Sequence, residues 1–287
     1  MTLESLRCFC SIVETGSFHA AADRVHRSQP AVSQQLKTLE REVGHVLIER
    51  KTARPTSAGQ TLYDRARKML VDADAMAREI KDFDESASRE LRVGTSDTTA
   101  LYLLPPYIRR FARLMPQTRL VLTNRSSDAI ADLVARAELD LGIVTLPLNC
   151  PELSEEILFR QRMVLVLPAK HPLAKVQRLT LQAVKEEPFL LIDENTRTGA
   201  ILRAYFHEAH FTPQVVLDSG SFEVIKRYVA EGVGLSFVPE CVVTPQDRRL
   251  RTRPLNELPE VPIGAIVRKG AYQSKAERAF LALMQGQ

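Results

Sequence analysis

The sequence predicts an α/β protein with an N-terminal winged helix-turn-helix, a long helix and a two-lobed α/β region. Three observations lead to this prediction. Two short helical patterns meet near residues 26–27, apolar residues then repeat in heptads over 62–83, and strand and helix patterns alternate from residue 90 onward. Apolar residues make up 45% of the 287 and charged residues 26%, which is typical of a globular chain with two or three domains.

A helix is expected over residues 3–15, and two further helices within 17–43 follow its end at Gly16. Ser28 stands where an N-cap is needed, and Pro30 is tolerated in the first helical turn. One face of the third helix is an apolar stripe formed by Val32, Leu36, Leu39 and Val43, and the other carries Pro30, Ser33, Gln34, Lys37 and Arg41. Small, amide and cationic side chains suit the major groove of DNA, although an ordinary helical hairpin with a solvated face fits the same spacing.

A basic turn follows these helices. Residues 46–50 and 54–56 predict two short strands, and Arg50, Lys51 and Arg54 around their turn are placed for phosphates or a minor groove. The first 70 residues hold eleven Lys or Arg against seven Asp or Glu, so the chain's whole excess of +4 is N-terminal. Double-stranded DNA is therefore the expected partner of this part.

A long amphipathic helix is expected next. Ser57 and Gln60 have capping-box spacing, and polar residues 84–89 suggest a hinge at the far end. One helix cannot bury a heptad seam by itself, so the seam predicts dimerisation, with packing on its own domain as the alternative. The predicted seam consists of Leu62, Ala66, Met69, Ala73, Met76, Ile80 and Phe83.

From residue 90 the apolar pattern changes to short runs separated by helical stretches. This alternation predicts parallel sheets covered on both faces, and its two similar halves suggest two lobes. The extended segments 159–164 and 261–265 are candidate crossovers between the lobes.

Several function classes are not expected. The N-terminus lacks a basic-then-apolar signal and no apolar run reaches membrane-spanning length, so a cytoplasmic protein without membrane contact is predicted. No metal or other cofactor is expected, and catalysis is disfavoured because His171, His207 and His210 stand outside any catalytic motif. Redox sensing through Cys150 and Cys241 is an alternative, disfavoured because no adjacent cation would lower a thiol pKa.

The order of these parts and several short sequence segments resemble those of the LysR-type transcriptional regulators. The phrases that carry the resemblance are FCSIVETGSFHAAADRVHRSQPAVSQQLKTLEREVG, LIERKTARPTSAG and VAEGVGLSFVP, and they are spread along the whole chain. The wing turn is a residue or two shorter than in the family, so both Lys51 and Arg54 remain candidates for DNA contact.

The resemblance implies an assembly and a set of partners. It implies a homotetramer built as a dimer of dimers that binds promoter DNA, with RNA polymerase as a further partner. Gln29, Pro30, Ser33 and Gln34 match the family's base-reading positions. The C-terminal region would resemble type II periplasmic binding proteins and hold a small co-inducer. The expected domains are 1–58 (winged helix-turn-helix), 59–88 (linker helix and hinge) and 89–287, with lobe I at about 89–160 and 266–287 and lobe II at about 161–265.

The expected effector site lies beyond the carboxyl ends of the strands, where helix N-termini offer free N–H groups. In LysR relatives the first such turn carries hydroxyl residues that hold an anion, which points to Ser96 and Thr98, while plain helix capping is the alternative for each Ser or Thr. Asp97 opposes a simple anion; if it faces the cleft, Arg and Asp together suit a zwitterion such as an amino acid. The remaining candidates are Arg125, Ser126, Thr145, Thr196, Arg197 and Ser221.

Overall fold

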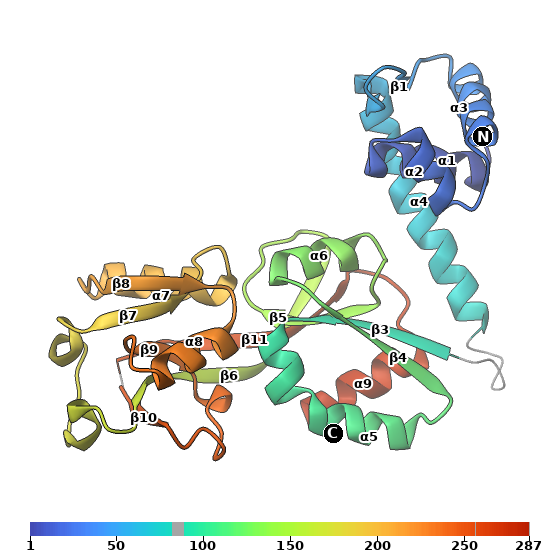
Figure 1. The fold of residues 1–287 in the computed structure, drawn as a ribbon. Coiled ribbons are helices and arrows are strands. Elements are labelled where there is room, and N and C mark those ends of the chain that lie inside the picture. The colour runs from blue at the N-terminus through green and yellow to red at the C-terminus, as the bar shows by residue number, and fades with distance from the viewer. Residues whose placement is uncertain (82–88, 256, 287) are drawn as a thin grey trace. The chain divides into compact units, whose positions relative to one another are not determined.

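A computed structural model describes residues 1–81, 89–255 and 257–286 of the chain. The chain forms two compact units, Met1–Glu85 and Ser86–Gln287, and each is described by itself. The first unit contains α1 (Leu3–Thr15), α2 (Phe18–Arg24), α3 (Gln29–Val43), β1 (Ile48–Glu49), β2 (Arg54–Pro55) and α4 (Ser57–Lys81), as Figure 1 shows.

The helix-turn-helix forms where the sequence predicts it. The Ser28 hydroxyl accepts a hydrogen bond from the backbone N–H of Ala31, and Pro30 lies in the first turn of α3. The helix ends at Gly44, whose φ of +77° is in the left-handed region that glycine adopts without steric cost. Val32, Leu36 and Leu39 are fully buried, so α3 packs its predicted stripe inward and presents the opposite face to solvent.

The wing is smaller than expected. Ile48 pairs with Pro55 and Glu49 with Arg54, and these two antiparallel pairs make up the whole ribbon. The predicted capping box at Ser57 and Gln60 is wrong, because Thr56 caps α4 instead. Its hydroxyl accepts from the backbone N–H of Gly59 at 3.0 Å, whereas the Gln60 side chain bonds to Asp64.

The heptad seam of α4 has two different environments. Ala66 is buried and Leu62 partly buried in the core of the first unit, together with Leu70, which lies outside the predicted seam. Met69, Met76 and Ile80 are instead 48%, 60% and 71% exposed. The N-terminal part of the seam therefore packs on its own domain and the later part is open to solvent. Phe83 and the predicted hinge at 84–88 lie outside the described residues, and Arg89 begins a strand.

The second unit is an α/β structure with a mixed sheet. Its strands are β3 (Arg89–Thr95), β4 (Thr118–Asn124), β5 (Leu141–Thr145), β6 (Leu153–Pro168), β7 (Pro188–Ile192), β8 (Gln214–Ser219), β9 (Ser236–Pro239), β10 (Leu250–Pro254) and β11 (Glu260–Arg268). Strands β3, β4 and β5 are parallel, as are β7 and β8, but β11, β10 and β9 run antiparallel to the strands they pair with. The expected parallel pairing is therefore present in each lobe, but the sheet as a whole is mixed. The sequence pattern also missed β10, because its LRTRP segment is mostly polar.

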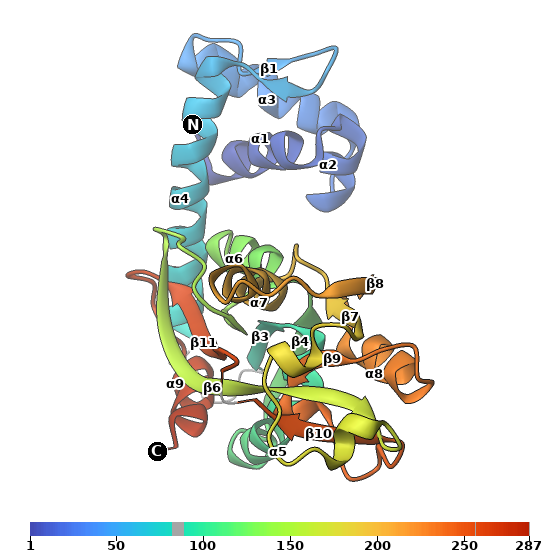
Figure 2. The ribbon, with the colours of Figure 1, turned by 90° about the vertical axis from the view of Figure 1, so that its left-hand side faces the viewer.

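Two lobes share the long strand β6. Its first part pairs with β11 in a sheet with β5, β3 and β4, and its last residues pair with β9 and β10. Figure 2 shows β6 as a long curved ribbon that runs through both lobes. The helices are α5 (Pro105–Leu114), α6 (Ser127–Ala135), α7 (Arg197–Glu208), α8 (Phe222–Ala230) and α9 (Lys275–Gln285), with a π-helical turn η1 (Thr99–Leu103) and short 3-10 turns η2 (Pro172–Lys175), η3 (Gln182–Val184) and η4 (Glu240–Val242).

The helices cover the sheet and close the core. In the first lobe α6 lies on one face of the sheet, and α5 and α9 lie on the other (Figure 1). The second lobe has an aromatic core in which the ring of Phe237 stacks on Phe189 at 5.0 Å between centroids and contacts Phe206 at 5.3 Å. These packed cores leave the strand ends that face the other lobe free to line a cavity.

Candidate functional site

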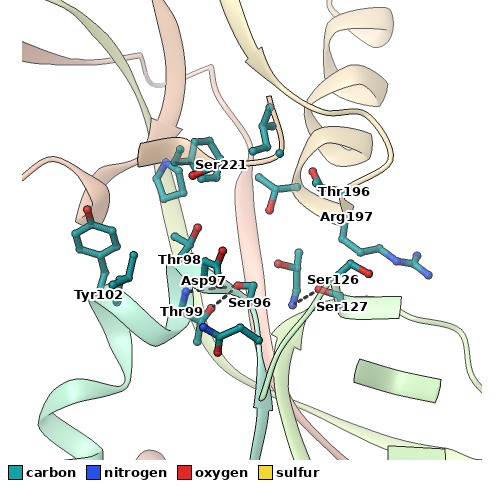
Figure 3. A pocket seen from close by; sticks show the side chains of 18 of the residues that line it. Ser96, Asp97, Thr98, Thr99, Tyr102, Ser126, Ser127, Thr196, Arg197 and Ser221 are labelled. Atoms are coloured by element: carbon teal, nitrogen blue, oxygen red, sulfur yellow. Dashed lines mark hydrogen bonds between the residues drawn. The ribbon is translucent and has the colours of Figure 1, made fainter. Parts of the chain in front are cut away.

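A cavity of about 510 Å³ lies between the two lobes of the second unit, where several strands end. Its wall is formed by the turns after β3, β4 and β5 in the first lobe and by those before α7 and α8 in the second (Figure 3). All nine residues predicted as effector contacts line it, although their role in binding stays a prediction. They are Ser96, Asp97, Thr98, Arg125, Ser126, Thr145, Thr196, Arg197 and Ser221.

The turn after β3 contributes the first edge of the cavity. Thr95 anchors this turn, because its buried hydroxyl donates to the carbonyl of Ile143 at 2.8 Å. The Ser96 hydroxyl donates to the hydroxyl of Thr99 at 3.2 Å, so Ser96 is partly engaged within the turn. Asp97 is exposed at the cavity wall, and its carboxylate bonds to none of the described residues. Its carboxylate therefore does not cap the helix that follows.

The N-termini of α6, α7 and α8 meet at this cavity. Ser126 caps α6 by accepting from the N–H of Ala129, and Thr196 caps α7 by accepting from Gly199 at 3.0 Å. Capping is thus a role of both hydroxyls, as the alternative interpretation held. The hydroxyl of Ser221, at the start of α8, makes no capping bond. Three positive helix ends directed at one space favour an anionic group there.

Gly199 allows α7 to begin so close to the strand end. A Cβ atom at this position would lie 2.0 Å from the carbonyl oxygen of Asp193, a separation that real side chains do not show. Any larger residue would push the first turn of α7 away from β7 and the cavity.

The two arginines of the cavity differ in their partners. The Nε and Nη2 atoms of Arg197 donate to Oδ1 of Asp128 on α6 at 3.0 and 2.5 Å, and Nη1 donates to the carbonyl of Pro147 at 2.9 Å. Figure 3 shows this side chain extending away from Asp97 and Thr98. Arg125 is exposed, and among the described residues its guanidinium donates to the neighbouring carbonyl of Asn124, at 2.8 Å. Arg125 is therefore the arginine that remains available for a ligand.

A second polar link crosses the cavity at Tyr102 on η1. The Tyr102 hydroxyl donates to Glu223 on α8 and accepts from Nζ of Lys226 at 3.0 Å, which joins the first lobe to the second. Lys226 is 6% exposed and also bonds to the carbonyl of Val242 and to Asp247. Burial acts against its charged form, but the bonds to Tyr102 and Glu223 outweigh it and raise the pKa of Lys226.

Sequence reasoning missed this link because Tyr102 and Glu223 belong to helical segments far apart in the chain. The available signal was a lysine on the apolar face of α8, where Phe222, Ile225 and Val229 are buried. A cation on such a face requires a partner, but the pattern does not identify it.

Four hydroxyls among the described residues of the cavity wall are free for a ligand. Those of Thr98, Thr145, Thr198 and Ser221 form no hydrogen bond with any described residue. Each can donate or accept, so the cavity offers neutral polar groups beside its charged ones.

In the first unit, the face of α3 opposite its core is open to solvent. Gln29, Pro30, Gln34 and Lys37 are exposed and Ser33 is half-buried. On the wing, Lys51 and Arg54 are exposed as well. The structure therefore brings the predicted base-reading residues together on one helical face beside a basic turn.

Arg50 has a carboxylate partner that the sequence did not predict. Its guanidinium forms an ion pair with Oε2 of Glu40 at 2.7 Å and donates to the hydroxyl of Ser33 at 3.4 Å. Glu40 also accepts from the backbone N–H groups of Leu47 and Ile48, at 2.9 and 3.4 Å. Arg50 and Glu40 thus connect α3 to the wing, so Arg50 is not a free cation on this surface.

The sequence raised reactive cysteines and catalytic histidines as alternatives to effector binding. Burial raises the pKa of the Cys150 and Cys241 thiols, and the two belong to different packed clusters. Within residues 1–81, 89–255 and 257–286, no group of three His, Cys, Asp or Glu is placed to hold a metal ion, and no helix is both long and apolar enough to cross a bilayer. The three histidines considered for catalysis, His171, His207 and His210, lie away from the cavity wall.

Comparison with known proteins gives matches over both units. Residues 3–60 match the family model of the bacterial regulatory helix-turn-helix protein, lysR family, and residues 84–287 match the LysR substrate binding domain. The regulator SsuR of Burkholderia cenocepacia is 32% identical over 259 residues, which cover 88% of this chain and 83% of that protein. The Hca operon transcriptional activator HcaR of Escherichia coli is 28% identical, with 99% and 97% of the two chains covered.

A solved structure gives the same result for the fold. A full-length OxyR variant from Pseudomonas aeruginosa superposes with a TM-score of 0.76 at 27% identity, over 99% of this chain and 93% of that one. These relatives are transcriptional regulators, in which a helix-turn-helix is joined to a two-lobed domain like the one described above. With its helix-turn-helix and its two-lobed substrate-binding domain both matched, this chain belongs to the LysR family of transcriptional regulators.

Proposed function

We propose that a small molecule with an anionic group binds in the cavity and thereby changes the affinity of this regulator for promoter DNA. The observation that carries the proposal is the convergence of the N-termini of α6, α7 and α8 on one space. Free N–H groups and aligned peptide dipoles stabilise an anion at such a point. Arg125 adds a cation that has no carboxylate partner among the described residues, and the nine predicted contact residues would surround the ligand.

The DNA-binding part of the proposal rests on the exposed face of α3. Gln29, Pro30, Ser33 and Gln34 would contact base edges, and Lys37, Arg50, Lys51 and Arg54 would contact phosphates. Residues 1–58 would form the DNA-binding domain, 59–88 the linker and 89–287 the effector domain, with lobe I at about 89–160 and 266–287. We propose no enzymatic activity and no cofactor.

Assembly is proposed from α4. Met69, Met76 and Ile80 leave an apolar strip open to solvent, and a second copy of the same helix would cover it. Two such dimers would associate into a tetramer that binds two DNA half-sites. This tetramer would act in the cytoplasm and contact RNA polymerase at the promoter.

The test combines ligand binding with DNA binding. Small carboxylates, amino acids and inorganic oxyanions are screened by thermal shift with the full chain, and a hit at a hundredfold excess over Kd should stabilise it by about 2.7 kcal/mol. DNA is selected from a random pool by the ligand-free protein, and its affinity is then measured with and without the hit. Ser96→Ala and Thr98→Ala should each reduce the thermal shift and leave ligand-free DNA binding intact.

Ser154→Ala is the matched control, because Ser154 is exposed on β6 and does not line the cavity. A hit that stabilises Ser96→Ala and Thr98→Ala as fully as the wild type binds elsewhere, and a hit that leaves DNA affinity unchanged contradicts the regulatory role of the cavity.

A further inference from the structure

Four ionic side chains line the cavity, and two of them are already compensated. Arg197 is paired with Asp128, and Glu223 with Lys226 at 3.0 Å. Each pair includes a residue that lies outside the cavity wall and supplies the opposite charge. A ligand gains little from Arg197 or Glu223, because it would have to compete with a partner that is present in the folded chain.

The other two, Asp97 and Arg125, are not compensated. Neither has an ion-pair partner among the described residues, and they form no ion pair with each other. Both are exposed at the cavity wall, where water solvates them in the absence of a ligand. A ligand that fills the cavity removes this water, so each charge then requires a partner from the ligand.

Their positions in the sheet place them side by side. Strands β3 and β4 are adjacent and parallel, with Thr95 opposite Asn124, and the N–H of Arg125 donates to the carbonyl of Thr95 at 3.1 Å. Asp97 comes two residues after Thr95, and Arg125 one residue after Asn124. Neighbouring strands lie about 4.8 Å apart, so the two charged side chains leave the sheet at closely spaced points.

We infer that the effector is a small zwitterion, with a cationic group for Asp97 and an anionic group for Arg125, and with the two groups as close as in an α- or β-amino acid. This inference rests on the proposed function and narrows its ligand class. A plain carboxylate would satisfy Arg125 and the helix N-termini but would bring a second negative charge beside an unpaired and newly dehydrated Asp97. The free hydroxyls of Thr98, Thr145, Thr198 and Ser221 add hydrogen bonds without changing this balance of charge.

The test measures binding to the full chain by thermal shift and calorimetry with matched sets of probes. Each set contains an α-, β- or γ-amino acid, the carboxylic acid that lacks its amino group and the amine that lacks its carboxyl group. We expect an α- or β-amino acid that binds while its two matched partners bind at least about tenfold more weakly, since a hydrogen bond to a charged group contributes that much or more.

Two substitutions test which group of the ligand each charged residue binds. Asp97→Asn should weaken the amino acid about tenfold or more and leave or improve binding of its des-amino acid, and Arg125→Gln should weaken both. Asp132→Asn and Arg110→Gln, exposed changes of the same kind on α6 and α5 away from the cavity, should alter neither.

The inference is overturned if the des-amino acid binds wild type as well as the amino acid does. It is equally overturned if Asp97→Asn leaves the amino acid unaffected, or if no amino acid in the panel binds. The proposed function is judged separately: a carboxylate that binds and changes DNA affinity supports it against the zwitterion. An amino acid that binds without changing DNA affinity supports the zwitterion against the regulatory role.

Discussion

Arg197 at the first position of α7 is ion-paired with Asp128 in the first turn of α6, so one residue from each lobe meets beside the cavity. The contact uses one of the two arginines that the sequence suggested as ligand contacts. Its guanidinium also donates to the carbonyl oxygens of Pro147 and Leu148, which leaves little of its hydrogen-bonding capacity unused. The pair therefore holds the lobes together more than it attracts a ligand.

The first prediction concerns the two arginines of the cavity. Arg125→Gln should weaken effector binding more than Arg197→Gln does, because Arg197 is paired with Asp128 whereas Arg125 pairs with no carboxylate of the described residues. The side chains of Arg197 and Asp128 are 29% and 55% exposed, so water screens their attraction. Urea unfolding of Arg197→Gln, Asp128→Asn and the double variant should give a coupling energy of only about 0.5 kcal/mol. A larger loss of effector affinity in Arg197→Gln than in Arg125→Gln contradicts this ranking.

The second prediction concerns α4. Met69→Asp combined with Met76→Asp should convert the full-length oligomer to smaller species with little loss of helix content, since both methionines are largely exposed in the chain. Sedimentation velocity measures the mass, and circular dichroism the fold. Lys68→Asp, an exposed change off the seam, should leave the assembly intact. Leu70→Asp should instead unfold the first unit, because Leu70 is 8% exposed in its core. A double variant that keeps the wild-type mass means that α4 does not hold the subunits together.

The third prediction separates base reading from phosphate contact. Gln34→Ala should relax the base preference at one position of each half-site, at a cost of about 1–3 kcal/mol for the preferred base. Lys37→Ala and Arg54→Ala should weaken all sequences alike and reduce the slope of log affinity against log salt by about one each. Selection from random DNA followed by a salt titration measures both effects. Gln35→Ala is the control on the same helix, and an unchanged preference in Gln34→Ala removes Gln34 from the base-reading set.

The fourth prediction concerns Arg50. Because Arg50 is ion-paired with Glu40, Arg50→Ala should loosen the wing as well as weaken DNA binding. Glu40→Gln should also weaken DNA binding, although it removes a negative charge that would otherwise repel phosphates. Fluorescence anisotropy with one DNA duplex measures both variants. If Glu40→Gln binds DNA more tightly than the wild type, the Arg50–Glu40 pair affects DNA affinity through its charge alone and not by positioning the wing.

The fifth prediction concerns the thiols. Burial raises the pKa of Cys10 to about 12 and also raises the pKa of Cys241, and burial together with the Glu152 carboxylate raises that of Cys150. A raised pKa means less thiolate at neutral pH, so alkylation of the folded chain at pH 7.5 should be slow and should accelerate as the pH rises above 9. Mass spectrometry after iodoacetamide treatment measures this, with the urea-unfolded chain as control. Rapid modification of Cys150 or Cys241 at pH 7.5, together with altered DNA binding, would support redox sensing.

The sequence by itself determined the local features of this protein. The apolar stripe of Val32, Leu36 and Leu39 specifies which face of α3 is buried, and Ser28 specifies where the helix begins, because periodicity and capping depend on residues close together in the chain. The strand pattern likewise predicted nine polar residues at or just after the ends of strands, and all of them line one cavity.

The tertiary structure decided which of these groups are free to act. Arg197 and Arg125 look alike in the sequence, but Asp128 pairs with one of them across 69 residues of chain. Arg50 likewise gains Glu40 as a partner only in the fold, and the seam of α4 is at least partly buried at Leu62 and Ala66 but exposed at Met69, Met76 and Ile80. Ion pairs and burial depend on which segments distant in sequence come into contact in the fold. The periodicity of residues along the chain does not predict those contacts.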